Sequence, residues 1–147
     1  MRLVMIDKMY LKQYSKDNEM LHNAQRPCGL IVQLKYKGRR YDFAVPLRSN
    51  IPAAAPKREY FPLPPRPTTR PRNRHGIHYA KMFPIRRSWI HPFHTNNNLY
   101  AAMIKAIVDE NEKQIIRECQ DYLLRYEQGD RPRYSTDLDT LIDIMNK

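Results

Sequence analysis

The chain has 147 residues and a formal net charge of +11 at pH 7. Its length predicts a single domain, residues 1–147, with a core of its own. No apolar run approaches the roughly 20 residues that cross a bilayer, and residues 1–10 do not resemble a secretory signal. Cys28 and Cys119 lie far apart and form no disulfide framework, so a reducing cytoplasm is the expected location.

The first predicted elements are short. Residues 3–6 form a buried strand, residues 8–15 a short helix and residues 29–36 a second strand. Lys37-Gly38 predicts a hairpin turn into a strand at 39–46, because glycine accepts a positive φ without steric cost.

The end of that hairpin raises the main question of the sequence. Tyr41, Phe43 and Val45 alternate with the period of a strand that has one buried face. The pattern stops at Pro46, so residues 47–50 (LRSN) are predicted to leave the sheet as a loop. Such a loop is either an ordinary polar turn or a phosphate site.

Residues 50–74 contain seven of the twelve prolines and are predicted to form neither a helix nor a central strand. An irregular segment of this length is usually functional or disordered. Two further strands are predicted at 78–85 and 88–93.

The last third of the chain changes to a helical pattern. Residues 99–126 carry an apolar stripe, Asn96 to Asn98 offer N-caps, and Gly129 ends the pattern. Ser135 is predicted to cap a last helix, with Asp137 near its positive end. The fold class is therefore α+β, a mostly antiparallel sheet with helices packed on one side and a long C-terminal helix.

Positive charge is concentrated in the first two thirds of the chain. Residues 1–98 have a charge balance of +14 and residues 99–147 a balance of −3, and residues 57–87 hold nine basic residues and one acid. Such a field attracts polyanions, above all nucleic acid. An acidic membrane surface is the less favoured partner, because the basic region lacks amphipathic helical spacing.

An arginine cluster refines this prediction. It alternates with proline and threonine and is flanked by aromatic residues, a mixture typical of single-stranded RNA binding. The cluster consists of Arg66, Arg70, Arg72 and Arg74, with Tyr60, Phe61 and Tyr79 beside it.

Two H-x-x-H pairs, His75 with His78 and His91 with His94, do not predict a metal site. On a strand, side chains three residues apart point in opposite directions, and zinc needs three or four convergent ligands. A neutral histidine that carries protons beside a phosphodiester fits better. Ser49 lacks the G-x-S-x-G elbow of serine hydrolases, and its simplest role is a loop hydrogen bond.

Three stretches in order, DKMYLKQY, NAQRPCGLIVQLKYKGRRYDFAVPLRS and HGIHYAKMFPI, resemble the ToxN/AbiQ-like endoribonucleases of type III toxin–antitoxin systems. The TenpN/CptN branch is the most similar. The resemblance implies a compact twisted sheet and metal-independent RNA cleavage that leaves a 2′,3′-cyclic phosphate, with no cofactor. It also implies a repeat-derived RNA antitoxin folded as a pseudoknot, closed protein–RNA assemblies in the bacterial cytoplasm, and defence against phage by abortive infection.

The resemblance also implies site residues. The tyrosine of the family falls on Tyr10, its basic residue before the second strand on Arg26, and its threonine-serine pair on Arg48 and Ser49. Its lysine two residues beyond the serine falls on Ile51, so another group must supply that charge or a proton. The candidates for that replacement are Arg48, Lys57, Lys81, His75 and His78.

The predicted catalytic residues are Ser49, Arg48, Tyr10, Arg26 and His78. The predicted RNA-binding residues are Lys57, Arg66, Arg70, Arg72, Arg74, His75, Tyr79, Lys81, Arg86 and Arg87. Two alternatives stay open: a non-catalytic RNA-binding protein, and a metal-dependent nuclease built on the histidine pairs.

Overall fold

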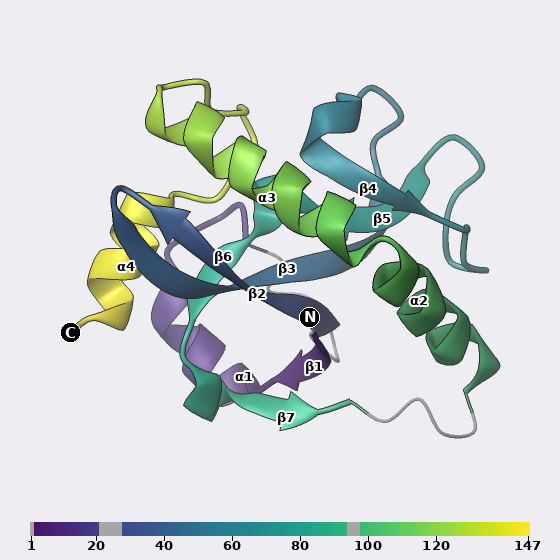
Figure 1. Ribbon diagram of the computed structural model, residues 1–147, viewed down its shortest axis with the longest axis horizontal. Coiled ribbons are helices and arrows are strands. Elements are labelled where there is room, and N and C mark those ends of the chain that lie inside the picture. The colour runs from purple at the N-terminus through teal and green to yellow at the C-terminus, as the bar shows by residue number, and fades with distance from the viewer. Residues whose placement is uncertain (1, 21–27, 94–97) are drawn as a thin grey trace.

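A computed structural model describes residues 2–20, 28–93 and 98–147. In this part of the chain a seven-stranded sheet has the order β4-β5-β3-β2-β1-β7, with β6 paired to β3 beside that path (Figure 1). Every strand pairing is antiparallel. The strands are β1 (Arg2–Ile6), β2 (Cys28–Tyr36), β3 (Arg39–Ile51), β4 (Tyr60–Leu63), β5 (Arg74–His78), β6 (Phe83–Ile85) and β7 (Ile90–Pro92).

The described α-helices are α1 (Lys8–Leu11), α2 (Leu99–Glu110), α3 (Glu112–Glu127) and α4 (Leu138–Met145). Short 3₁₀ turns connect several elements, at Lys12–Tyr14, Lys57–Glu59, Tyr79–Lys81 and Arg87–Trp89. No helix in the described ranges is long and apolar enough to cross a membrane. The predicted α+β class is confirmed.

The central strand β3 corrects the prediction that the sheet ends at Pro46. It continues for 13 residues to Ile51, pairing first with β2 and β6 and then with β5. Pro46 is the last residue paired with β2, and the pairing with β5 begins at Leu47. A proline lacks an amide donor, and such a junction between partners tolerates that loss. Arg48 and Ser49 are therefore in a strand, not in a loop.

The predicted hairpin turn is confirmed at Lys37-Gly38. Tyr36 pairs with Arg39, and the two turn residues have φ of 49° and 79°. Both values are positive, as a tight two-residue hairpin requires, and glycine at the second position adopts that conformation without strain.

Two hydrophobic clusters cover opposite faces of the sheet, because neighbouring residues of β3 alternate between them. Phe43 and Val45 belong to the first cluster and Ala44 to the second. The long helices α2 and α3 pack on the first face, as expected, and α1 covers the second (Figure 1). The first cluster includes Leu30, Val32, Leu34, Ile104, Ile115, Cys119 and Leu123, and the second includes Val4, Ile6, Leu11, Tyr14, Phe83 and Trp89.

The helical stripe predicted over residues 99–126 is divided in two. Asn98 caps α2 by accepting a hydrogen bond from the amide of Ala101, at 3.0 Å. Asn111 has φ −113° and ψ 16°, and its side-chain amide donates to the carbonyl of Ile107. This local bond competes with the continuous helix, so α3 starts in a new direction. Gly129, with φ 92°, follows the end of α3 as predicted.

The start of α4 also differs from the prediction, because its N-cap is Asp137 and not Ser135. The Asp137 carboxylate accepts from the amide of Thr140, at 3.2 Å, whereas the Ser135 hydroxyl donates to the carbonyl of Pro132. An aspartate at this position also interacts favourably with the positive end of the helix.

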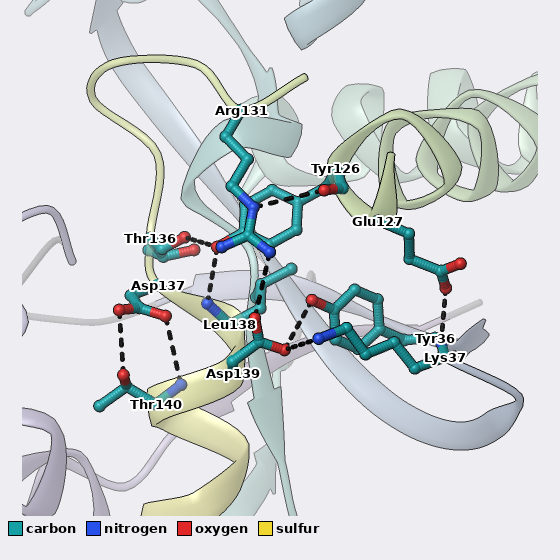
Figure 2. A network of polar contacts seen from close by, with 10 residues as sticks. All are labelled: Tyr36, Lys37, Tyr126, Glu127, Arg131, Thr136, Asp137, Leu138, Asp139 and Thr140. Atoms are coloured by element: carbon teal, nitrogen blue, oxygen red, sulfur yellow. Dashed lines mark hydrogen bonds and ion pairs between the residues drawn. The ribbon is translucent and has the colours of Figure 1, made fainter. Parts of the chain in front are cut away.

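A polar network joins α4 to α3 and to the β2–β3 hairpin (Figure 2). The Asp139 carboxylate accepts from Tyr36 Oη at 2.8 Å and pairs with Lys37 at 2.9 Å and Arg131 at 3.2 Å. Tyr126 Oη donates to the carbonyl of Thr136 and accepts from the amide of Leu138, both at 3.1 Å. The chain between α3 and α4 is thereby fixed against the sheet.

Three other predictions are corrected in part. The strand predicted at 78–85 is interrupted by the turn Tyr79–Lys81, and β7 occupies only Ile90–Pro92 of the predicted 88–93. The proline-rich segment is not irregular throughout, since it contains β4. This strand lies at the edge of the sheet, where a proline such as Pro62 is tolerated.

Candidate functional site

A pocket of about 440 Å³ lies beside the second half of β3. Arg48 of β3, His78 at the end of β5 and Lys81 in the following turn all line it. Small residues that follow β3, from Pro52 to Pro56, form one wall, and the segment Pro132–Tyr134 before α4 forms another. A volume of this size falls within the range of small-ligand sites.

Next to the pocket, β3, β4 and β5 approach one another closely. Arg48 pairs with Gly76 of β5, and a Cβ on Gly76 would lie only 2.5 Å from the carbonyl oxygen of Phe61 in β4. Glycine is therefore required at this position. A bulge between Arg48 and Ile51 follows, and a bulge redirects side chains at the end of a ladder.

Arg48 is half-buried in the pocket. Burial lowers the pKa of its guanidinium, and the nearby Glu19 carboxylate partly counteracts that effect. An arginine stays protonated in proteins despite such shifts. The pocket therefore contains a permanent cation that is only partly screened by water.

His78 is 4% exposed, and its Nδ1 has no hydrogen-bond partner among the described residues. Burial, together with the charges of Arg48 and Lys81, lowers the pKa of His78 to about 3. The imidazole is consequently neutral at physiological pH, so one ring nitrogen can donate a hydrogen bond and the other can accept one, and the ring has no excess proton to deliver.

Lys81 is 6% exposed, and its ammonium makes two short contacts. Nζ donates to Glu19 Oε2 at 2.8 Å and to the carbonyl oxygen of Tyr134 at 2.6 Å. The sequence predicted an RNA-binding residue here and a candidate replacement for the lysine that the resemblance implies. The structure instead places the ammonium inside the pocket and pairs it with an acid.

Ser49 follows Arg48 in the bulged part of β3 and is half-buried, but it does not line the pocket. Ile51 is fully buried. The position that matches the lysine of the toxin family is therefore a core position, and the cations of the pocket lie at Arg48, Lys81 and Arg133.

Tyr10 in α1 is 42% exposed and stacks on Trp89, with ring centroids 5.4 Å apart and planes 8° from parallel. Because β1 and β3 both run antiparallel to β2, they point the same way; Tyr10 follows β1, and Ser49 lies near the end of β3. Both residues therefore lie towards the same end of the sheet. Arg26, the fifth predicted catalytic residue, lies outside the described residues.

The predicted arginine cluster forms an exposed loop, residues 66–74, which we call the arginine loop. Asn50, next to Ser49, ties it to β3: its Oδ1 accepts from the amide of Arg70 at 2.9 Å, and its Nδ2 donates to the carbonyl of Thr68 at 3.1 Å. The sequence analysis missed Asn50, because only the fold brings it next to the loop. None of the four arginines, Arg66, Arg70, Arg72 and Arg74, forms an ion pair within the described part of the chain.

His75 faces away from His78, as strand geometry predicted. It is buried, and its Nδ1 lies 2.7 Å from Tyr100 Oη and 2.8 Å from the carbonyl oxygen of Pro64. These contacts make it a structural residue and correct the prediction of RNA binding. The described residues contain no cluster of three or more potential metal ligands, and His94 lies outside them.

Other predicted RNA-binding residues lie apart from the pocket. Tyr79 is fully buried and donates to Glu118, so it cannot stack on a base, and this prediction is wrong. Arg86 donates to the carbonyl of Met145, and Arg87 pairs with Asp42, about 23 Å along β3 from Ser49. Lys57 lines a separate hollow between β4 and α3. Arg86, Arg87 and Lys57 thus do not converge with Arg48.

No protein-family model matches the sequence, and no curated protein matches it. Several solved structures match the fold. One comes from work on a processed non-coding RNA that regulates a bacterial antiviral system. Its TM-score is 0.76 at 15% identity, and the match covers 100% of this chain and 99% of that one. The second is AbiQ, a lactococcal anti-phage endoribonuclease of a type III toxin–antitoxin system. Its TM-score is 0.69 at 13% identity, and the match covers 97% of this chain and 93% of that one.

The third structure concerns selective toxin inhibition by a non-coding RNA pseudoknot in bacterial type III toxin–antitoxin systems. Its TM-score is 0.69 at 14% identity, over 97% of this chain and 95% of that one. This chain therefore shares the fold of these three structures, AbiQ among them, and the resemblance seen in the sequence is confirmed at the level of fold.

Proposed function

We propose that this protein is the endoribonuclease toxin of a type III toxin–antitoxin system. It cuts RNA at selected sequences, processes its own repeat-derived RNA antitoxin and is inhibited by it in a closed protein–RNA assembly. Its cellular role in a bacterium is abortive infection against phage. The shared fold with an anti-phage endoribonuclease and with a toxin inhibited by an RNA pseudoknot supports this proposal.

The observation that carries the proposal is the convergence of Arg48, His78 and Lys81 in one pocket beside Ser49. Buried positive charge next to a neutral imidazole suits a phosphodiester that gains negative charge during reaction. The exposed arginine loop, tied to the same strand end by Asn50, supplies charge that holds the rest of the RNA strand.

In the proposed reaction the nucleophile belongs to the RNA. The 2′-oxygen attacks the adjacent phosphorus, the bond from phosphorus to the 5′-oxygen breaks, and a 2′,3′-cyclic phosphate remains. The 5′-oxygen leaves as a hydroxyl with a proton from solvent water. Holding the two reacting atoms in line lowers the barrier by several kcal/mol, and one donor to the developing oxyanion contributes about 3 kcal/mol.

Each site residue has a role in this scheme. Arg48 neutralises the phosphate, Ser49 donates a hydrogen bond to it, and the neutral His78 accepts the proton of the 2′-hydroxyl. A bound phosphate would raise the pKa of His78 from its low value in the free protein, because it offsets the charges of Arg48 and Lys81. Tyr10 offers a partly exposed ring for a neighbouring base.

The test uses protein from which bound RNA has been removed, and RNA transcribed from the toxin's own locus. We expect new 2′,3′-cyclic ends in the presence of EDTA, and no cleavage when the nucleotide before the cut carries 2′-deoxyribose, although that RNA still binds. Cleavage of the deoxy substrate at the same phosphate would contradict the mechanism. Inhibition by EDTA would favour a metal-dependent nuclease, and RNA left intact throughout would favour a non-catalytic RNA-binding protein.

A further inference from the structure

The pocket already contains an anion of its own, the carboxylate of Glu19. We propose that this carboxylate occupies the binding position of one RNA phosphate, and that the phosphate displaces it when RNA binds. The proposal rests on the proposed function for the class of its ligand, the phosphodiester of an RNA strand. It adds a residue that controls access to the site.

The contact between Glu19 and Lys81 separates the ammonium from solvent. The Lys81 side chain is 6% exposed and that of Glu19 is 36% exposed, and Oε2 of Glu19 lies 2.8 Å from Nζ. The other contact of Nζ is the carbonyl oxygen of Tyr134, in the pocket wall. An anion that approaches Lys81 from solvent therefore meets the Glu19 carboxylate first.

The backbone at Glu19 is anchored, but the end of its side chain is not. The amide of Glu19 donates to Asp17 Oδ1 at 2.9 Å, and Asp17 Oδ2 accepts from the amide of Asp137 at 3.0 Å. These bonds fix the turn to the start of α4. The glutamate side chain has rotatable bonds of its own, so the carboxylate can move into solvent while the turn stays in place.

The charge of the pocket favours this exchange. It is lined by three cations, Arg48, Lys81 and Arg133, and by two carboxylates, Glu19 and Glu59, so in the free protein their formal charges sum to +1. When Glu19 moves out, the formal charge of the remaining groups rises to +2, which favours an anionic phosphodiester in its place. The imidazole of His78 adds an unpartnered Nδ1, which donates to a phosphate oxygen when it carries the ring proton.

Exchange of one anion for another keeps Lys81 paired at every stage. A buried ammonium without a partner is strongly unfavourable, so the free protein needs Glu19 in this position. Once a phosphate has replaced the carboxylate beside Lys81, water solvates the carboxylate, and the loss of its ion pair costs little free energy. A phosphate on a strand already held by the arginine loop has a high effective concentration and competes best. Glu19 would thus select against small free anions.

Three variants separate displacement of a specific group from a change of net charge. Glu19→Gln removes the charge and keeps an acceptor for Lys81. Glu19→Asp keeps the charge and shortens the side chain by about 1.5 Å, which breaks the contact. Glu59→Gln is the matched control, because it removes one negative charge from the same pocket and leaves the contact between Lys81 and Glu19 unchanged.

The measurement is the affinity for a mixed-sequence 2′-O-methyl RNA dodecamer, followed by fluorescence anisotropy at low salt, with thermal unfolding as a check of each fold. We expect binding to become tighter by about tenfold for Glu19→Gln and about threefold for Glu19→Asp, and by less than twofold for Glu59→Gln. Equal effects of Glu19→Gln and Glu59→Gln, with no effect of Glu19→Asp, would overturn the proposal.

The dodecamer lacks a free 2′-hydroxyl, so this result does not depend on cleavage. If the Glu19 variants behave as expected but the protein never cuts natural RNA, the proposed nuclease activity fails and the phosphate site stands. If the protein cuts RNA and the three variants bind alike, the nuclease stands and the role of Glu19 is refuted. A crystal structure with bound RNA and the Lys81–Glu19 contact intact would also refute it.

Discussion

Lys81 in the pocket is 6% exposed and bonded to two oxygens, whereas Arg70 and Arg72 in the arginine loop are exposed and form no ion pair among the described residues. The two regions carry the same sign of charge in opposite environments. A cation in water attracts a polyanion over a distance and is weakened by salt, and a desolvated cation acts at short range and strongly. Under the proposed function, the loop therefore provides affinity for RNA and the pocket provides the chemistry.

The largest expected effect concerns the pocket. We expect Arg48→Gln to lower the rate of cleavage at saturating RNA by about 100-fold or more, because a desolvated cation stabilises the charge that develops on the phosphate. Single-turnover kinetics measures this rate. Arg39→Gln, an exposed arginine on the β2–β3 hairpin, is the charge-matched control and should cleave at the wild-type rate. A similar loss in both variants would end the distinction between pocket and surface charge.

The next prediction concerns the desolvation of His78, whose pKa of about 3 lies below the usual 6.5. Between these values the unfolded chain binds a proton that the folded chain rejects. The free energy of unfolding is therefore unaffected above pH 6.5 and falls as the pH decreases towards 3, by up to about 1.4 kcal/mol per pH unit.

Urea unfolding of the wild type and of His78→Gln at several pH values checks this. In His78→Gln, the dependence of the free energy of unfolding on pH should be smaller by the contribution of about one proton. An equal slope of the free energy of unfolding against pH in the wild type and in His78→Gln would mean that water reaches the imidazole in the pocket.

The smallest effect is expected in the arginine loop. Arg70→Gln or Arg72→Gln should weaken RNA binding a few-fold and reduce the slope of log affinity against log salt by about 0.7 for each phosphate that the loop no longer neutralises. Binding isotherms at several salt concentrations measure this. An unchanged salt slope in both variants would remove the loop from the RNA-binding surface.

Some of the fold could be read from local sequence. The strand at 3–6, the strand at 29–36 and the Lys37-Gly38 turn follow from alternation and from the freedom of glycine, which depend on neighbouring residues only. The prediction that the strand ends at Pro46 was wrong for the same reason. Whether a proline ends a strand depends on which partner strand faces it, and that partner is distant in the sequence.

The candidate site was predicted less completely. Arg48, Ser49 and His78 were singled out from the sequence, but their surroundings were not. Tyr79 was expected to stack on RNA and is instead fully buried, where it donates to Glu118. Asn50 and Glu19 gave no signal, because a single polar residue in a basic segment has no distinctive pattern.

The sequence by itself determined the excess of positive charge, its concentration before residue 99, and the change from strands to helices at about that residue. Only the tertiary structure decided which charges stay in water and which are withdrawn from it. Lys81 and Glu19 are 62 residues apart and meet at 2.8 Å. Burial and pairing arise from contacts between distant segments, and these contacts form only when the whole sheet and its helices pack together.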